Sequence, residues 1–169
     1  ASIAGTIPTP GLASYGAATA ALISLTRSLD PEETDAGARV TAICPGSYDP
    51  VTNGHLDIIS RASRVFDRLV VGVVGSAPRK SGHLFTPEER KELIEEAVAG
   101  NGIENVEVRI FRTLLVEFAR ECGATAIVKG LRAISDFEYE FEMNQLNRTL
   151  AEEIESVYIL ASPGYSFIR

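Results

Sequence analysis

The chain passes from a buried strand into a helix at Pro45–His55, whose sequence is PGSYDPVTNGH. The apolar run Val40–Cys44 before it is typical of a strand, and helical spacing of apolar residues starts near Leu56. A glycine-rich turn at a helix start offers free backbone N–H groups and the positive end of the helix dipole. The residues Thr52–His55 add a hydroxyl, an amide, a glycine that permits close approach and an imidazole. This stretch predicts a phosphate-binding turn and therefore nucleotide chemistry.

Strands and helices alternate along the rest of the chain. The expected strands are Val40–Cys44, Leu69–Val74, Val106–Ile110, Ala126–Val128 and Val157–Leu160. The expected helices start near Leu56, at the capping box Thr86–Glu89, at Leu114 and at Asp136, and the last one runs to about Leu150. Most of these strands are apolar throughout, which predicts right-handed βαβ units and a five-stranded parallel sheet covered by helices on both faces.

One edge of this sheet is the expected binding site, because ligands of such sheets bind beyond the carboxyl ends of the strands. The segments that follow strands are Ser47–His55, Ser76–Lys80, Lys129–Arg132 and Ser162–Phe167. They would bring the imidazole of His55 together with cations from Arg79, Lys80, Lys129 and Arg132. Such a cluster fits an anionic substrate and phosphoryl or nucleotidyl transfer. Of the alternating Glu138, Glu140 and Glu142, at least two are expected to be solvated.

Composition and charge narrow the function. The 169 residues are 45% hydrophobic, enough for a core, and carry a formal charge of −7. An acidic surface repels nucleic acid and anionic membranes, so neither is an expected partner. Cys44 and Cys122 are expected to be free thiols that bind no metal. P-loop, zincin and zinc-ribbon motifs are absent, and so is any apolar run of about 18 residues or a leader, which indicates a cytoplasmic protein.

Residues 41–168 resemble the bacterial phosphopantetheine adenylyltransferase family. The motifs that carry this resemblance are Ala42–His55, Phe85–Arg90, Ile127–Arg132, Asp136–Glu140 and Tyr165–Ile168, in that order. The resemblance implies a Rossmann-like nucleotidyltransferase fold with three α/β/α layers. It also implies transfer of AMP from ATP to 4′-phosphopantetheine, with Mg²⁺, forming dephospho-CoA and pyrophosphate. Members of the family are usually hexamers, which allows a homo-oligomer here.

The same resemblance implies roles for individual residues. His55 would stabilise the pentacovalent transition state, Ser47 would hold the attacking phosphate, and Lys80 and Arg132 would contact phosphates. The residues implied in nucleotide binding are Gly54, Lys129, Gly130, Glu140 and Tyr165. The residues implied along the pantetheine arm are Leu114, Leu115 and Asn147, together with Ser47. No residue is implied as a direct metal ligand.

The C-terminal end departs from this family. After Ser166–Ile168 the family continues with a serine-rich turn and a helix that bind ATP phosphates, whereas this chain ends at Arg169. We therefore expect weakened ATP binding and an activity that is reduced or lost. The alternative function is that of a non-catalytic, engineered chimeric α/β scaffold.

The first 45 residues resemble a different family, the short-chain dehydrogenases/reductases. Ser2 and Tyr15 match the spacing of that family's catalytic pair, but Thr19 stands where the family has its lysine. The glycine-rich dinucleotide turn is missing too, so dehydrogenase activity is not expected. Both resemblances include Ala42–Gly46. We interpret the chain as a recombined, engineered protein that is joined at a shared strand.

The start of the chain is expected to contribute one helix. Residues 1–13 are rich in Gly, Pro, Ser and Thr, residues Ser14–Leu29 have the small and apolar residues of a packed helix, and residues 30–38 form an acidic connector. We expect the helix to pack on the sheet, so that residues 1–169 form a single α/β domain.

Overall fold

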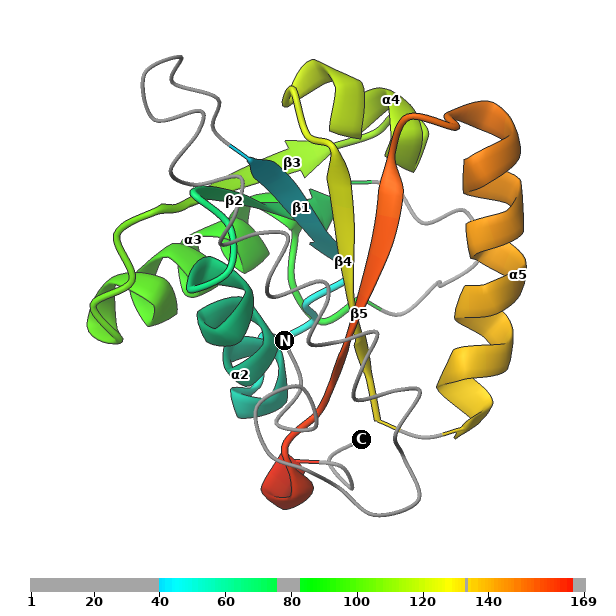
Figure 1. Cartoon of the computed structure of the whole chain (residues 1–169). Coiled ribbons are helices and arrows are strands. Elements are labelled where there is room, and N and C mark those ends of the chain that lie inside the picture. Colours follow the sequence, from blue (N-terminus) through cyan, green and yellow to red (C-terminus); the bar gives the residue numbers. More distant parts are fainter. Residues whose placement is uncertain (1–39, 76–82, 133, 166–169) are drawn as a thin grey trace, which may run out of the picture. The chain divides into compact units, whose positions relative to one another are not determined.

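The computed structural model describes residues 40–75, 83–132 and 134–165 (Figure 1). The expected helix Ser14–Leu29 and the site residue Lys80 lie outside these residues. The packing of that helix and the single-domain organisation therefore stay predictions.

The core of the described chain is a parallel sheet. Its strands are β1 (Thr41–Gly46), β2 (Arg68–Val74), β3 (Val106–Phe111), β4 (Ala126–Leu131) and β5 (Glu155–Leu160). They form a five-stranded sheet in the order β3-β2-β1-β4-β5, and every neighbouring pair is parallel. The predicted sheet is thus confirmed. The strand order reverses at β1, between β2 and β4, and such a switch point is where ligands bind in open α/β sheets.

Helices cover both faces of the sheet (Figure 1). They are α2 (Asn53–Ser63), α3 (Pro87–Gly100), α4 (Leu115–Glu121) and α5 (Ile134–Leu150), followed by the short 3₁₀ helix η2 (Pro163–Tyr165). Successive residues of β1 point to opposite faces, so Ala42 and Cys44 join one core cluster and Ile43 joins the other. The first cluster contains Ile59 of α2 and Ile94 of α3, and the second contains the apolar residues of α4. The three-layer α/β/α architecture is therefore confirmed.

Three boundaries differ from the sequence-based expectation. Helix α2 begins at Asn53 instead of near Leu56, because Thr52 caps it. Strand β4 continues to Leu131, so Lys129 and Gly130 lie on the strand and not in a loop after it. Asp136, expected as the cap of the last helix, lies in the first turn of α5 and accepts hydrogen bonds from the backbone and side chain of Arg132 instead.

The described residues also show the state of the two cysteines and the end of α4. Cys44 and Cys122 are free thiols, as predicted, and both are buried. Gly123 has a φ of +65° just after α4, which is the left-handed conformation of a glycine C-cap. Among the described residues, no helix combines the length and the apolar character that a membrane crossing needs.

Candidate active site

A capping box with Thr52 fixes His55 in the first turn of α2. The hydroxyl of Thr52 accepts the backbone N–H of His55 at 3.4 Å, and the backbone N–H of Thr52 donates to Nδ1 of His55 at 3.1 Å. Because Nδ1 accepts a hydrogen bond, we assign the proton of the neutral ring to Nε2. The imidazole therefore presents an N–H donor at the carboxyl edge of the sheet.

The surroundings of His55 favour its neutral form. Burial lowers the pKa of His55 below its ordinary value of 6.5, and the positive charge of Arg132 lowers that pKa further. The ring of Tyr48 meets the imidazole edge-on, with 5.0 Å between centroids and an interplanar angle of 73°. At neutral pH the residue is thus an uncharged hydrogen-bond donor.

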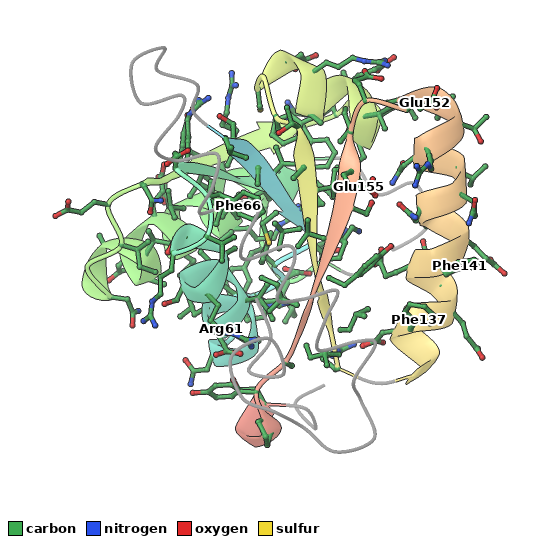
Figure 2. The ribbon with its side chains drawn as sticks, viewed as in Figure 1. Arg61, Phe66, Phe137, Phe141, Glu152 and Glu155 are labelled. Carbon is green, nitrogen blue, oxygen red and sulfur yellow. The ribbon has the colours of Figure 1, made fainter. Side chains whose placement is uncertain are left out.

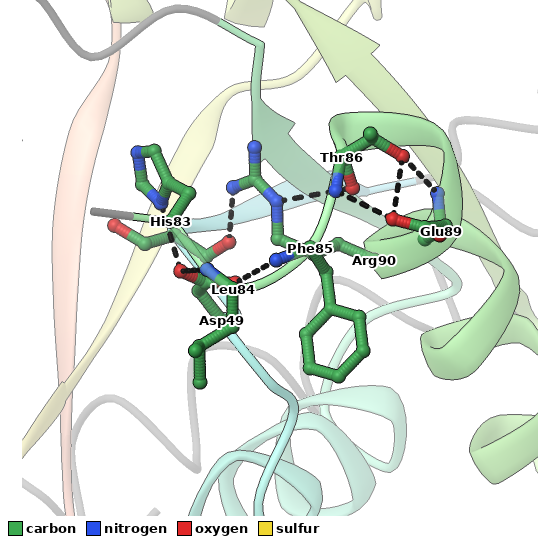
Figure 3. Close-up of polar contacts among 8 residues, drawn as sticks. Asp49, His83, Leu84, Phe85, Thr86, Glu89 and Arg90 are labelled. Carbon is green, nitrogen blue, oxygen red and sulfur yellow. Dashed lines mark hydrogen bonds and ion pairs between the residues drawn. The ribbon is translucent and has the colours of Figure 1, made fainter. Parts of the chain in front are cut away.

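The turn between β1 and α2 is fixed by contacts from the segment that precedes α3 (Figure 3). The carboxylate of Asp49 accepts the backbone N–H groups of Leu84 and Phe85 at 2.9 and 3.0 Å, and it lies 3.0 Å from Nδ1 of His83. Partial burial raises the pKa of Asp49, but these hydrogen bonds outweigh it and leave that pKa below its usual value. Ser47 of the same turn is held in place as well, since its backbone carbonyl accepts a hydrogen bond from Arg90.

Lys129 and Glu140 form an ion pair between β4 and α5. Their Nζ and Oε2 atoms are 3.1 Å apart, and the two side chains are 21% and 18% exposed. Tyr158 of β5 donates its hydroxyl proton to the backbone carbonyl of Glu140 at 3.3 Å. Lys129 therefore brings less net positive charge to this edge than the sequence suggested. Glu138 and Glu142 are exposed, as predicted for two of the three glutamates.

The two glycines of the predicted site differ in how much space the neighbouring atoms leave for a side chain. A Cβ atom on Gly130 would lie 2.9 Å from Cγ1 of Ile58, so glycine at this position lets α2 pack closely on β4. A Cβ atom on Gly54 would lie 3.6 Å from both Thr52 Oγ1 and Tyr165 Cβ, which is ordinary contact. Packing within the described chain does not require glycine at position 54, but this distance places Tyr165 beside the start of α2.

Asp57 connects the segment after β5 to α2, and no local sequence pattern predicts this contact. Its carboxylate accepts the backbone N–H of Ser162 at 3.1 Å and the hydroxyl of Ser162 at 2.9 Å. Arg61 donates to the carbonyl of Leu160 at 2.7 Å and also contacts Asp57. These contacts hold the backbone that leads to Tyr165 against the helix that carries His55.

The residues implied along the pantetheine arm lie at the start of α4 and near the end of α5. Leu114 is exposed at the start of α4, Leu115 packs against the second core cluster, and Asn147 is buried near the end of α5. Within the part of the chain that the structure describes, none of these three residues forms a hydrogen bond with His55. The described site thus gathers Ser47, Gly54, His55, Lys129, Gly130, Arg132, Glu140 and Tyr165 around the carboxyl ends of β1, β4 and β5.

The parallel sheet and this site define a nucleotidyltransferase of the Rossmann-like type. The Cytidylyltransferase-like family matches residues 43–169. Among solved structures, a bifunctional NMN adenylyltransferase/ADP ribose pyrophosphatase from Francisella tularensis superposes with a TM-score of 0.56 at 16% identity, over 72% of this chain and 38% of that one. A lipopolysaccharide core biosynthesis protein from Thermoplasma volcanium superposes with a TM-score of 0.54 at 22% identity, over 74% of this chain and 98% of that one. Both likenesses show the fold alone.

More similar relatives identify the family within this class. A phosphopantetheine adenylyltransferase from Rubrobacter xylanophilus is 57% identical over 127 residues, 75% of this chain and 75% of the relative. One from Clostridium kluyveri is 54% identical over the same shares of both chains. The chain belongs to the phosphopantetheine adenylyltransferase family. The short chain dehydrogenase family matches residues 1–57, so both resemblances found in the sequence are confirmed.

Proposed function

We propose that this protein transfers the AMP moiety of ATP to 4′-phosphopantetheine. An oxygen of the substrate phosphate attacks the α-phosphorus, the bond between that phosphorus and the bridging oxygen breaks, and pyrophosphate leaves as dephospho-CoA forms. The observation that carries the proposal is the hydrogen bond from the backbone N–H of Thr52 to Nδ1 of His55, which leaves Nε2 as the donor of the ring. Membership of the family supplies the two substrates.

The proposed roles follow from the chemistry of each group. His55 donates from Nε2 to an oxygen of the pentacovalent phosphorus, where negative charge develops. Ser47 holds the attacking phosphate, and Lys80 and Arg132 neutralise phosphate charge. The residues that line the nucleotide site are Gly54, Lys129, Gly130, Glu140 and Tyr165. Little covalent chemistry remains for the protein, because positioning and charge stabilisation supply most of the catalysis of such transfers.

Mg²⁺ enters the proposal together with ATP. Among the described residues, no group of three or more His, Cys, Asp or Glu side chains could hold a metal ion, whereas cations and N–H donors are present at the site. That donor set fits an ion bound mainly by the nucleotide phosphates and water, as is common for Mg²⁺. When bound, the ion would neutralise charge on the phosphates.

A calorimetric titration followed by a turnover assay tests this function. We expect the protein to bind ATP and 4′-phosphopantetheine and to release pyrophosphate, and we expect His55→Ala to slow the release by about 10²–10³-fold. The expected reduction in turnover stays a prediction, which the same assay measures against the Rubrobacter relative.

A cytoplasmic location also stays a prediction.

A second candidate, the non-catalytic chimeric scaffold, is favoured by one observation. Two unrelated families match this chain, and their matches overlap in residues 43–57. The scaffold predicts that neither ATP nor 4′-phosphopantetheine binds, so the titration separates the two candidates.

We further propose that the protein forms a homo-oligomer. Helix α5 leaves large apolar side chains in contact with solvent, among them Phe137 and Phe141, which are 47% and 50% exposed and whose rings are 6.0 Å apart (Figure 2). Exposed apolar side chains that gather on one helix are typical of protein interfaces. Light scattering after size-exclusion chromatography tests this: a monomer at micromolar concentration would contradict it.

A further inference from the structure

Arg90 is a buried cation whose role the function above does not use. It is 2% exposed, on the first turns of α3. Its Nη1 atom donates to the carbonyl of Ser47 at 2.6 Å, and its Nε atom donates to the carbonyl of Thr86 at 3.3 Å (Figure 3). None of the ion pairs formed among the described residues includes Arg90. A buried charge that is held by neutral carbonyls alone is costly, because its desolvation is not repaid by an opposite charge.

The turn that Arg90 contacts is held in an unusual conformation. Tyr48 has a φ of +52°, in the left-handed region that bulky residues rarely adopt. Such a conformation persists where surrounding contacts over-determine it. Here the contacts are the hydroxyl of Tyr48 on the carbonyl of Cys44 at 2.9 Å, the three hydrogen bonds to Asp49, and Arg90 on Ser47. The backbone of Ser47 is therefore fixed before any substrate binds.

We propose that Arg90 is a positioning residue for a phosphate monoester bound at Ser47. It holds the backbone of Ser47, and its charge, which pairs with no carboxylate among the described residues, lies behind the turn, where it stabilises the dianionic phosphate. An interaction of this kind is strong because the guanidinium is shielded from water. The inference deepens the proposed function and rests on it for the identity of the monoester, 4′-phosphopantetheine.

Two substitutions separate charge from shape. Arg90→Met removes the charge and keeps much of the volume, whereas Arg90→Lys keeps the charge and loses the planar fork that reaches two carbonyls. Arg64→Met is the matched control, since Arg64 is exposed at the far end of α2. Circular dichroism and thermal melting select conditions in which each variant is folded.

Calorimetry with 4′-phosphopantetheine and with pantetheine, which lacks the phosphate, gives the test. We expect Arg90→Met to raise the Kd of 4′-phosphopantetheine at least about tenfold, the range for truncating a desolvated charge partner. Arg90→Lys should raise it less, and the affinity for pantetheine should not change. In the turnover assay, KM for 4′-phosphopantetheine should rise while KM for ATP stays constant. Arg64→Met should change none of these values.

The outcomes distinguish this inference from the proposed function. Binding of 4′-phosphopantetheine without pyrophosphate release overturns the proposed transfer, and the calorimetric comparison still tests Arg90. Folded Arg90→Met and Arg90→Lys proteins with the wild-type Kd overturn the positioning role, and so does an equal loss of affinity for pantetheine. If Arg90→Met does not fold, Arg90→Lys decides, because an unchanged Kd in that variant together with an unchanged KM contradicts the role of the planar fork. A wild-type protein that binds no phosphate monoester contradicts both proposals.

Discussion

The two halves of the site are held in place by different interactions. At the start of α2, neutral hydrogen bonds fix His55 through Thr52, and backbone groups fix Asp49. At the end of β4, ion pairs join Lys129 to Glu140 and Arg132 to Asp136. The first arrangement presents a preorganised hydrogen-bond donor. The second places cations near the carboxyl edge of the sheet, each paired with a carboxylate. We therefore expect the transition-state contact in the α2 half of the site and the adjustable charge in the β4 half.

The largest expected effect concerns the α2 half. His55→Ala and His55→Gln should each lower kcat by about 10²–10³-fold, the loss typical of removing one transition-state donor. Glutamine is common at the third helical position of a capping box, which His55 occupies, so His55→Gln should keep the stability of α2. Alanine cannot form this contact and should lower the free energy of unfolding by about 1 kcal/mol. Steady-state kinetics and urea unfolding measure the two quantities. Equal kcat values for His55→Gln and the wild type would place the catalytic donor elsewhere.

The next effect compares the two glycines. Gly130→Ala should lower the free energy of unfolding by about 1–3 kcal/mol, the usual range for overpacking a core, because the new Cβ meets Ile58. Gly54→Ala is its matched control, since its Cβ has ordinary contacts and alanine is favoured over glycine in a helix by up to about 1 kcal/mol. Denaturant unfolding of both variants gives the comparison. Gly130→Ala with wild-type stability would show that α2 can move away from β4 at no cost.

A smaller effect is expected for the ion pair of the β4 half. Glu140→Gln should lower stability by about 1 kcal/mol or less, since Glu140 and Lys129 remain partly solvated. The loss should shrink as salt screens the pair in the wild type. Thermal melts at low and high ionic strength measure it. A loss that does not depend on salt would contradict an electrostatic origin.

The smallest effect is electrostatic coupling between the halves. NMR titration should give His55 a pKa below 6.5, and Arg132→Met should raise that pKa without restoring it fully, because burial is the larger cause. A folded-state pKa below the unfolded one means that the unfolded chain binds more protons as the pH falls. Stability should therefore decrease as the pH drops through 6.5 towards the folded-state pKa. An unchanged pKa in Arg132→Met would uncouple the two halves.

The sequence predicted what local patterns and recurrent motifs encode. The apolar strands and the turn before His55 gave the parallel sheet and the edge where the site lies. The hydrogen bonds between Asp57 and Ser162 join residues 105 positions apart, and no local sequence pattern predicts them. Arg90 follows a capping box on an otherwise solvated helix start, so burial of its guanidinium depends on tertiary packing alone. Lys129 lies on β4 and not in the loop expected after it, and its ion pair with Glu140 was not predicted because that partner lies on another element.

Following the protein with ATP, Mg²⁺ and 4′-phosphopantetheine by ³¹P NMR tests the proposed transfer of AMP. The diphosphate signals of dephospho-CoA and the signal of pyrophosphate should grow together, at equal molar rates, and His55→Gln should slow both by about 10²–10³-fold. Failure of the wild-type protein to form dephospho-CoA, with the ATP and phosphopantetheine signals unchanged at high protein concentration, would contradict it.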